Sequence, residues 1–266
     1  MKHTLALFVL SSSLLLSGCT TTEALKKADG TSLNVRVTAT QAYDKKSAPT
    51  VLIGHGSAGV TANHIEWARI IKGWGFNTVI IDHYSLRGIG IHTGQIVAGA
   101  TSSDRAKDFT NVVEWVEKQS WHSGSMAIVG FSQGGAGVLA YVNSDVMKRL
   151  NPSFTEKNDP VVASIGVYPG CLIQQPPLKP RMPVLMLLAE KDDLARPEYC
   201  TNGNSSIPPL QDSNYSVKVL SNATHSFDEN IPSTTRLPFT QRYSSQAVGE
   251  MKIAMQEFFK NHLSLK

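Results

Sequence analysis

The chain has little excess charge and no closely spaced cysteines or histidines, and each shortage excludes a class of function. Its net charge is +4 and no run of lysine or arginine exceeds two residues, so binding to nucleic acid is not predicted. No two histidines are spaced i, i+4, there is no Cys-x-x-Cys pair, and His55, His64, His83 and His92 fall on separate predicted elements. We therefore predict no metal site and no cofactor.

The N-terminus has the composition of an export signal. Lys2 precedes an apolar stretch, Leu5 to Leu16, that is short for a membrane-spanning helix and ends in small residues. Its end, Leu16-Ser17-Gly18-Cys19, resembles the bacterial lipobox, which implies cleavage after residue 18 and lipidation of Cys19. We expect a signal peptide over residues 1–18, a lipidated tether over 19–30, and a lipoprotein anchored through its lipid to a membrane on the periplasmic side. Thr20 after the cysteine implies the outer membrane.

Apolar runs of strand length alternate with amphipathic runs of helix length after residue 30. An outer strand is predicted around Leu33, Val35 and Val37, and further strands at 50–53, 77–81, 126–131, 161–168, 183–189 and 216–220. Helices are predicted over 64–74, 103–119, 134–143 and 244–262, with a short helical turn over 196–201. The alternation predicts one α/β domain over residues 31–266, with a mostly parallel central sheet covered by helices on both faces.

The most informative segment is Gly130-Phe131-Ser132-Gln133-Gly134-Gly135, between a predicted strand and a predicted helix. A sharp turn from strand to helix holds the residue at its apex above the sheet edge, and only glycine tolerates the crowding at the flanking positions. The Ser132 hydroxyl would then stand at a helix N-terminus, where developing negative charge is favoured. This pattern indicates the nucleophile of a serine hydrolase.

A serine nucleophile needs a base and the base needs an acid, in the chain order serine, acid, histidine on this kind of sheet. Of the two histidines after Ser132, His262 lies near the end of the last predicted helix, whereas His225 lies in a polar loop after a strand. His225 is therefore the predicted base. The acid is expected directly after the strand at 183–189, where Asp192 and Asp193 both fit and spacing alone does not choose between them.

The oxyanion of an acyl-transfer reaction needs two donors. The backbone N–H of Gln133, next to the nucleophile, is one. The segment Gly54-His55-Gly56-Ser57-Ala58-Gly59 follows an early strand, and its three glycines allow a close backbone approach. We take the Ser57 N–H as the second donor.

These pieces together resemble the dienelactone hydrolase family of the α/β-hydrolase superfamily. The resemblance rests on segments 54–59, 82–88, 130–135, 168–171, 189–193 and 225–228. In that family the acid is the fourth residue of a Gly-x-x-Asp turn, which implies Asp192 with Ala189 at the glycine position. A family proline four residues after the acid fits Pro197 only from Asp193, so the choice stays open.

The chain departs from the enzymes that name the family at two positions. Those enzymes use a cysteine nucleophile where this chain has Ser132, and a glutamate where it has Gly56. The resemblance therefore implies ester or lactone hydrolysis in general. Arg87 resembles a family arginine and would either bind a substrate carboxylate or brace its loop against Asp82.

An exported compartment permits disulfides, and once Cys19 is lipidated Cys171 and Cys200 are the remaining pair. We expect a disulfide between them that holds the acid loop near the nucleophile. The whole sequence predicts a monomeric serine hydrolase of a small soluble ester or lactone, acting through an acyl-enzyme. The alternatives are a peptidase or amidase on the same fold, and a non-catalytic lipoprotein that uses the fold for binding.

Overall fold

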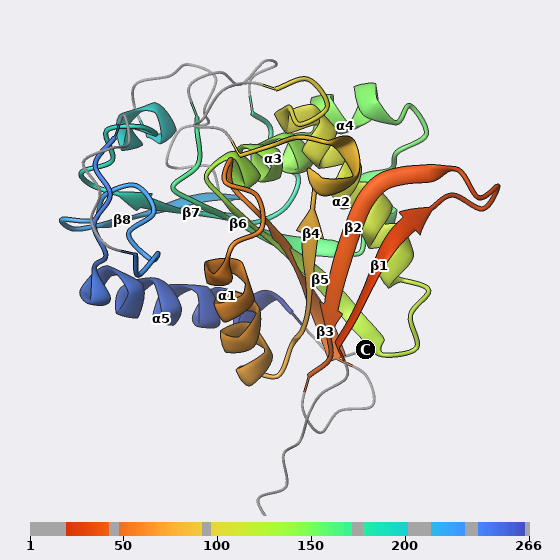
Figure 1. Ribbon diagram of the computed structural model, residues 1–266, viewed down its shortest axis with the longest axis horizontal. Helices are drawn as coiled ribbons and strands as arrows, with labels where there is room; N and C mark the ends of the chain where they lie inside the picture. Colours follow the sequence, from red (N-terminus) through yellow and green to blue (C-terminus); the bar gives the residue numbers. More distant parts are fainter. Residues whose placement is uncertain are drawn as a thin grey trace, which may run out of the picture.

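The computed structural model describes residues 20–42, 48–91, 97–171, 178–201, 214–231 and 239–263. This part of the chain contains one eight-stranded sheet in the order β1-β2-β4-β3-β5-β6-β7-β8 (Figure 1). The strands are β1 (Thr20–Lys26), β2 (Ser32–Thr40), β3 (Ala48–Gly54), β4 (Asn77–Asp82), β5 (His122–Phe131), β6 (Val161–Val167), β7 (Val184–Ala189) and β8 (Tyr215–Leu220).

The sheet is parallel apart from β2. Strand β2 is antiparallel to both of its neighbours, β1 and β4, and every other pair is parallel. The carboxyl ends of β3 to β8 therefore meet at one edge of the sheet. Gly54 at the end of β3 lies opposite Gly130 near the end of β5, which brings the two predicted catalytic loops side by side.

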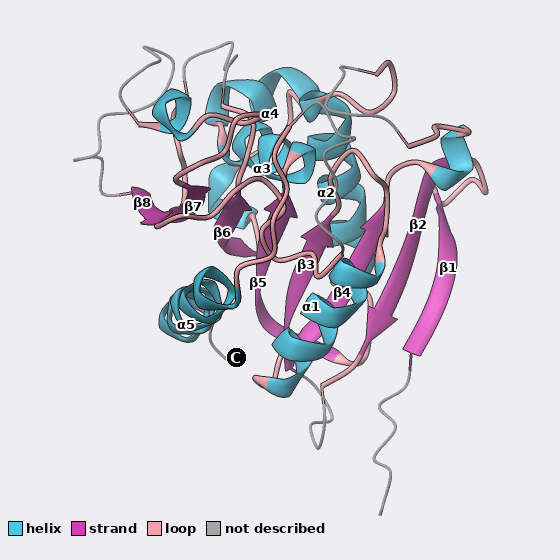
Figure 2. Ribbon diagram, turned by 60° about the vertical axis from the view of Figure 1, so that its left-hand side comes forward, coloured by secondary structure: helices cyan, strands magenta, loops and turns pink. Residues whose placement is uncertain are grey.

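Helices cover both faces of the sheet, as predicted (Figure 2). Helices α1 and α5 lie on one face, and α2, α3 and α4 lie on the other. The helices are α1 (Ala62–Gly73), α2 (Ser102–Val116), α3 (Gln133–Val142), α4 (Ser144–Leu150) and α5 (Ser245–His262), with short 3-10 turns η1 (Ser85–Arg87), η2 (Glu156–Asn158) and η3 (Pro197–Cys200).

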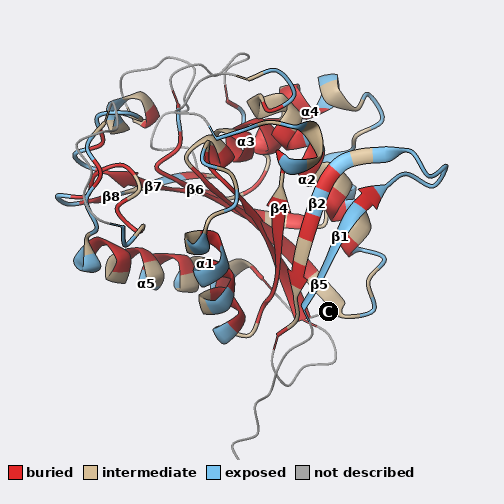
Figure 3. Ribbon diagram, in the orientation of Figure 1, coloured by how far each residue is buried: buried red, intermediate tan, exposed pale blue. Residues whose placement is uncertain are grey.

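The core consists of two apolar layers separated by the sheet. On the central strand β3, Leu52 points into the layer under α2 and α3, whereas Val51 and Ile53 point into the layer under α1 and α5. Because successive side chains of a strand alternate between its faces, a strand covered on both sides is apolar throughout. Every residue of β3 is buried, and Figure 3 shows the same burial across the middle of the sheet.

All the strands and the four long helices expected from the sequence are present, with ends displaced by a few residues. Residues 20–26 differ, because the predicted tether contains β1 as the outermost strand. Its threonines pair across to β2, with Thr22 opposite Thr38 and their hydroxyl groups 3.1 Å apart. β-Branched threonine favours a strand, and this edge strand is almost wholly exposed, so it lacks the apolar alternation by which strands are recognised.

Cys19 and the predicted signal peptide lie outside the described residues, so cleavage and lipidation stay predictions. Within the described ranges, no helix is both long enough and apolar enough to cross a membrane.

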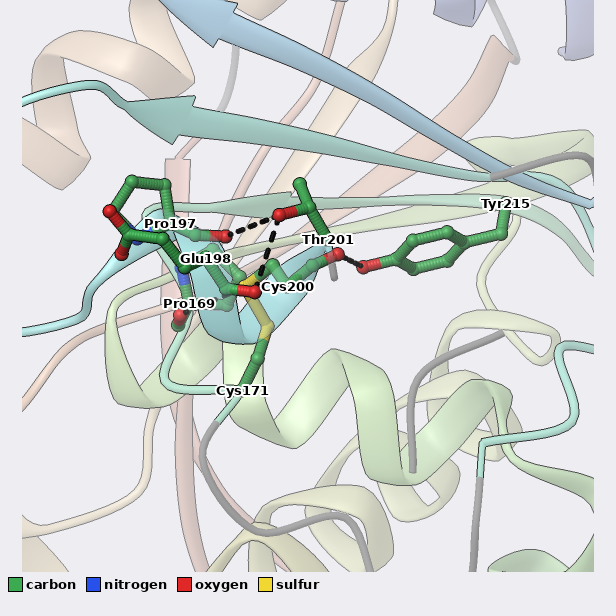
Figure 4. The surroundings of a disulfide bond; sticks show 7 residues. All are labelled: Pro169, Cys171, Pro197, Glu198, Cys200, Thr201 and Tyr215. Atoms are coloured by element: carbon green, nitrogen blue, oxygen red, sulfur yellow. Dashed lines mark hydrogen bonds between the residues drawn. A yellow bond between two sulfur atoms is a disulfide. The ribbon is translucent and has the colours of Figure 1, made fainter. Parts of the chain in front are cut away.

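The expected disulfide joins Cys171, after β6, to Cys200 in η3 (Figure 4). Both residues are buried, and the Tyr215 hydroxyl donates a 2.8 Å hydrogen bond to the Cys200 carbonyl oxygen. The bridge closes a loop with a sequence separation of 29 residues, and that loop contains β7 and the acid segment. It therefore ties the acid side of the sheet edge to the segment that follows β6.

Candidate active site

Ser132 sits at a strained turn between β5 and α3. Its φ of 52° and ψ of −114° lie outside the regions that side chains ordinarily favour. A Cβ atom on Gly130 would lie 2.2 Å from the Gly134 oxygen, and one on Gly134 would lie 2.4 Å from the Gly54 oxygen. Both glycines are therefore steric requirements of the turn, as the sequence predicted. The Ser132 N–H donates to the Val167 oxygen at 2.9 Å, which fastens the turn to β6.

Three predicted residues form one hydrogen-bonded chain. The Ser132 hydroxyl lies 3.0 Å from His225 Nε2, and His225 Nδ1 lies 2.7 Å from Asp192 Oδ2. With Nδ1 donating to the carboxylate, Nε2 is free to accept the serine proton. His225 and Asp192 are both buried, so solvent does not compete for these bonds.

The structure distinguishes the two candidate acids. Asp192 Oδ1 accepts the backbone N–H groups of Leu194 and Ala195 at 3.0 and 2.7 Å, which leaves Oδ2 aimed at the histidine. Asp193 is exposed and accepts both the N–H and the hydroxyl of Thr240. The acid position implied by the family resemblance is therefore the one that contacts His225.

The loop that carries His225 is anchored by a buried aspartate that sequence reasoning missed. Asp228 Oδ2 accepts bonds from Asn63 at 2.8 Å and from Trp67 Nε1 at 2.7 Å, both on α1. Its Oδ1 accepts the Tyr168 hydroxyl at 2.8 Å. Two donors from α1 and one from the residue directly after β6 thus fix the histidine loop in place. The position of Asp228 three residues after the base was the one available sequence signal.

The loop after β3 approaches the nucleophile closely. A Cβ atom on Gly56 would lie 3.2 Å from the Ser132 Cβ, so a larger residue there would press on the serine. Ser57 follows Gly56 and lines the same cavity as Ser132. Gln133 follows Ser132 and is the first residue of α3. Both predicted oxyanion donors therefore belong to segments that contact the nucleophile.

Arg105 on α2 connects these two segments and was not singled out in the sequence. Its guanidinium donates to the His55 carbonyl oxygen at 2.8 Å and to the Tyr84 hydroxyl at 2.6 Å. The Tyr84 hydroxyl donates in turn to Gln133 Oε1 at 3.0 Å. Arg105 is completely buried, and among the described residues no carboxylate lies within ion-pair distance of it. Burial lowers the pKa of its guanidinium, yet arginine stays protonated near neutral pH, so a fixed positive charge lies behind the loop.

Arg87 does not brace its loop against Asp82, as one of the two expectations had it. Its guanidinium makes a bidentate pair with Asp108 on α2, with both N–O distances at 2.6 Å, and also donates to the His83 carbonyl oxygen. The Asp82 carboxylate instead accepts the N–H groups of Tyr84 and Ser85. Arg87 therefore braces its loop, but it does so against Asp108 and not against Asp82. Sequence spacing could not show this, because Asp108 approaches from a different element.

A cavity of about 190 Å³ opens beside Ser132 and His225. Its apolar wall includes Phe131, Tyr168, Leu194 and Phe239. Its polar lining includes Ser57, His64, Ser226, Glu229 and Gln241. A small, mostly apolar pocket with a few polar groups is typical of a site for a small organic molecule.

A parallel sheet with one reversed strand, a nucleophile at a strand-to-helix turn, and a histidine and an acid after later strands define an α/β hydrolase. The chain belongs to the dienelactone hydrolase family, whose model matches residues 37–263. No curated protein sequence matches it.

Several solved structures share the fold at low sequence identity. A dienelactone hydrolase-like promiscuous phosphotriesterase from metagenomic libraries is 17% identical with a TM-score of 0.68, over 93% of this chain and 100% of the other. A dienelactone hydrolase from Anabaena variabilis is 13% identical with a TM-score of 0.63, over 93% and 100%. An α/β serine hydrolase without a lid from Xanthomonas campestris is 14% identical with a TM-score of 0.61, over 91% and 94%.

Proposed function

We propose that this protein hydrolyses a small ester or lactone through a serine acyl-enzyme, with Ser132, His225 and Asp192 as its triad. The observation that carries the proposal is the continuous hydrogen-bonded chain from the Ser132 hydroxyl through His225 to Asp192. A serine and a histidine held at 3.0 Å are within the reach that proton transfer requires.

In the first half-reaction His225 takes the Ser132 proton as the hydroxyl oxygen attacks the carbonyl carbon. The N–H groups of Gln133 and Ser57 bind the oxyanion, and Asp192 stabilises the imidazolium. His225 then gives the proton to the departing alkoxide, and the C–O bond breaks. In the second half-reaction His225 activates water, which attacks the acyl-enzyme and releases the acid and Ser132.

The chemistry of the nucleophile supports general ester substrates. Gly56 brings backbone, and no carboxylate, against Ser132, so a histidine base is the group placed to activate the nucleophile. The cavity of about 190 Å³ favours a short acyl group over a long chain.

The test is labelling of the purified protein with a fluorophosphonate, read as adduct mass and site. We expect one adduct on Ser132 and none in His225→Ala, because the hydroxyl is a weak nucleophile without its base. Ser132→Ala should lose ester turnover and keep its melting temperature. Substantial ester hydrolysis by a folded Ser132→Ala variant would contradict the proposal. A matched ester and anilide series, run beside it, measures the amidase alternative directly.

A further inference from the structure

Glu229 is an ionisable side chain in the pocket that the proposed mechanism does not use. It lies four residues after His225 and lines the same cavity as Ser132. The side-chain hydrogen bond described for it is a long one of 3.4 Å from Gln241 Nε2, made to Oε2. A carboxylate accepts several hydrogen bonds, so among the described residues Glu229 keeps acceptor capacity beyond this one long bond.

Aromatic rings line the same cavity as Glu229 and the reacting groups. The ring centroids of Tyr168 and Phe239 lie 4.8 and 5.2 Å from that of His225, and both rings line the cavity together with Phe131. The face of an aromatic ring carries negative partial charge and attracts cations, most strongly when water is excluded. A cation held in this cavity would therefore lie near aromatic rings as well as near Glu229.

The arginine offered for a carboxylate substrate is engaged elsewhere. Both terminal nitrogens of Arg87 are bound to Asp108, and Arg87 is absent from the cavity lining. Among the described residues that line the cavity there is no lysine or arginine. A substrate carboxylate would meet Glu229 without a compensating cation from that lining.

Building on the proposed hydrolysis, we propose that Glu229 selects substrates by charge, so that the pocket takes esters carrying an ammonium group and rejects esters carrying a carboxylate. Glu229 acts as a specificity-determining residue and takes no part in the covalent steps. The ammonium group lies against the aromatic wall with Glu229 as its counter-ion.

The experiment compares three acetate esters that differ mainly in charge: acetylcholine, its neutral carbon isostere 3,3-dimethylbutyl acetate, and the anion 3-acetoxypropionate. For the wild type we expect kcat/KM to be roughly tenfold higher for the cationic than for the neutral ester, which is about 1.4 kcal/mol. The anionic ester should be the poorest. In Glu229→Gln the cationic-to-neutral ratio of kcat/KM should fall to about one.

The matched control is Glu66→Gln, which removes the same charge from an exposed carboxylate paired with Arg69 on α1. It should keep the wild-type ratio, because a surface charge is screened by solvent and salt. A second measurement needs no variant: tetramethylammonium should inhibit wild-type hydrolysis of the neutral ester more strongly than tert-butanol does.

The outcomes separate this inference from the proposed function. If Ser132 is labelled and the neutral ester is hydrolysed, but the charge ratio is about one or survives in Glu229→Gln, the role of Glu229 is wrong and the hydrolase stands. Preference for the anionic ester, or tetramethylammonium inhibiting no better than tert-butanol, also overturns it. Absence of both labelling and turnover of every ester removes the proposed function itself.

Discussion

At the scale of single residues, the site combines groups that the sequence identifies with groups that it hides. Ser132 and its flanking glycines are local in the chain, so their pattern reveals the turn directly. Arg105 contacts the site through His55, Tyr84 and Gln133, which come from three separate segments. Such a residue is invisible to a reading of local patterns, since only the fold brings its partners together.

Arg105 should act as a positioning residue for the oxyanion. Arg105→Gln removes the buried charge and loosens both the His55 carbonyl and the Gln133 side chain. We expect kcat to fall about 10- to 100-fold with KM nearly unchanged, somewhat less than the loss of a direct oxyanion donor. The measurement is kcat and KM on a neutral ester, normalised to sites titrated with fluorophosphonate.

The control for this variant is Arg87→Gln, which also breaks a buried contact of α2 but touches neither donor segment. It should lower the melting temperature and leave kcat per titrated site close to the wild type. An unchanged kcat per titrated site in Arg105→Gln would mean that Arg105 only supports the fold.

At the scale of secondary structure, the buried strands and long helices follow from the sequence because burial imposes an apolar period. Strand β1 does not follow, since an exposed edge strand buries one of its seven residues and Thr20 to Thr22 resemble a polar linker. Helix α4 was also missed. It begins at Ser144 directly after α3, and Asn143 separates the two by capping α4 with its side chain. The choice between Asp192 and Asp193 as the acid likewise required the fold, because the side chains of adjacent residues point in different directions and only that of Asp192 reaches His225.

The disulfide should stabilise the acid side of the sheet. For a loop of this length the chain-entropy model gives about 3–4 kcal/mol, so a Cys171→Ser, Cys200→Ser double variant should unfold at lower urea concentration. Unfolding of the oxidised wild type, the same protein with dithiothreitol, and the double variant measures this. Dithiothreitol should shift the wild type towards the double variant and leave the double variant unchanged. Equal stability of all three samples would contradict the prediction.

At the scale of the whole molecule, three buried histidines couple the fold to pH. The ring of His55 lies 5.0 Å from that of His83 and 6.3 Å from that of His64, between the β3 and β4 loops and α1. Burial, reinforced by the positive charge of Arg105, lowers the pKa of His83 to about 4. Burial likewise lowers the pKa of His64 to about 4 and that of His55 well below its ordinary value. The native state therefore keeps all three rings neutral at pH values where an unfolded chain protonates them.

The unfolded chain binds these protons near pH 6.5, whereas the native state binds them only near pH 4. The contribution of these histidines to the free energy of unfolding is therefore fully present above pH 6.5 and is lost as the pH falls towards 4. Each of His64 and His83 should remove roughly 3 kcal/mol over that interval.

Urea unfolding at pH 7.5, 6.5, 5.5 and 4.5 measures the loss. His64→Asn, whose amide oxygen can still accept the Thr61 N–H that His64 Nδ1 accepts, should reduce the pH dependence by about one proton. An unfolding free energy that is equal at pH 7.5 and 4.5 would contradict this prediction, because it would mean that the folded protein binds these protons as readily as the unfolded chain does. Since His55 belongs to the loop that contacts the nucleophile, the same acid transition should remove the active site together with the fold.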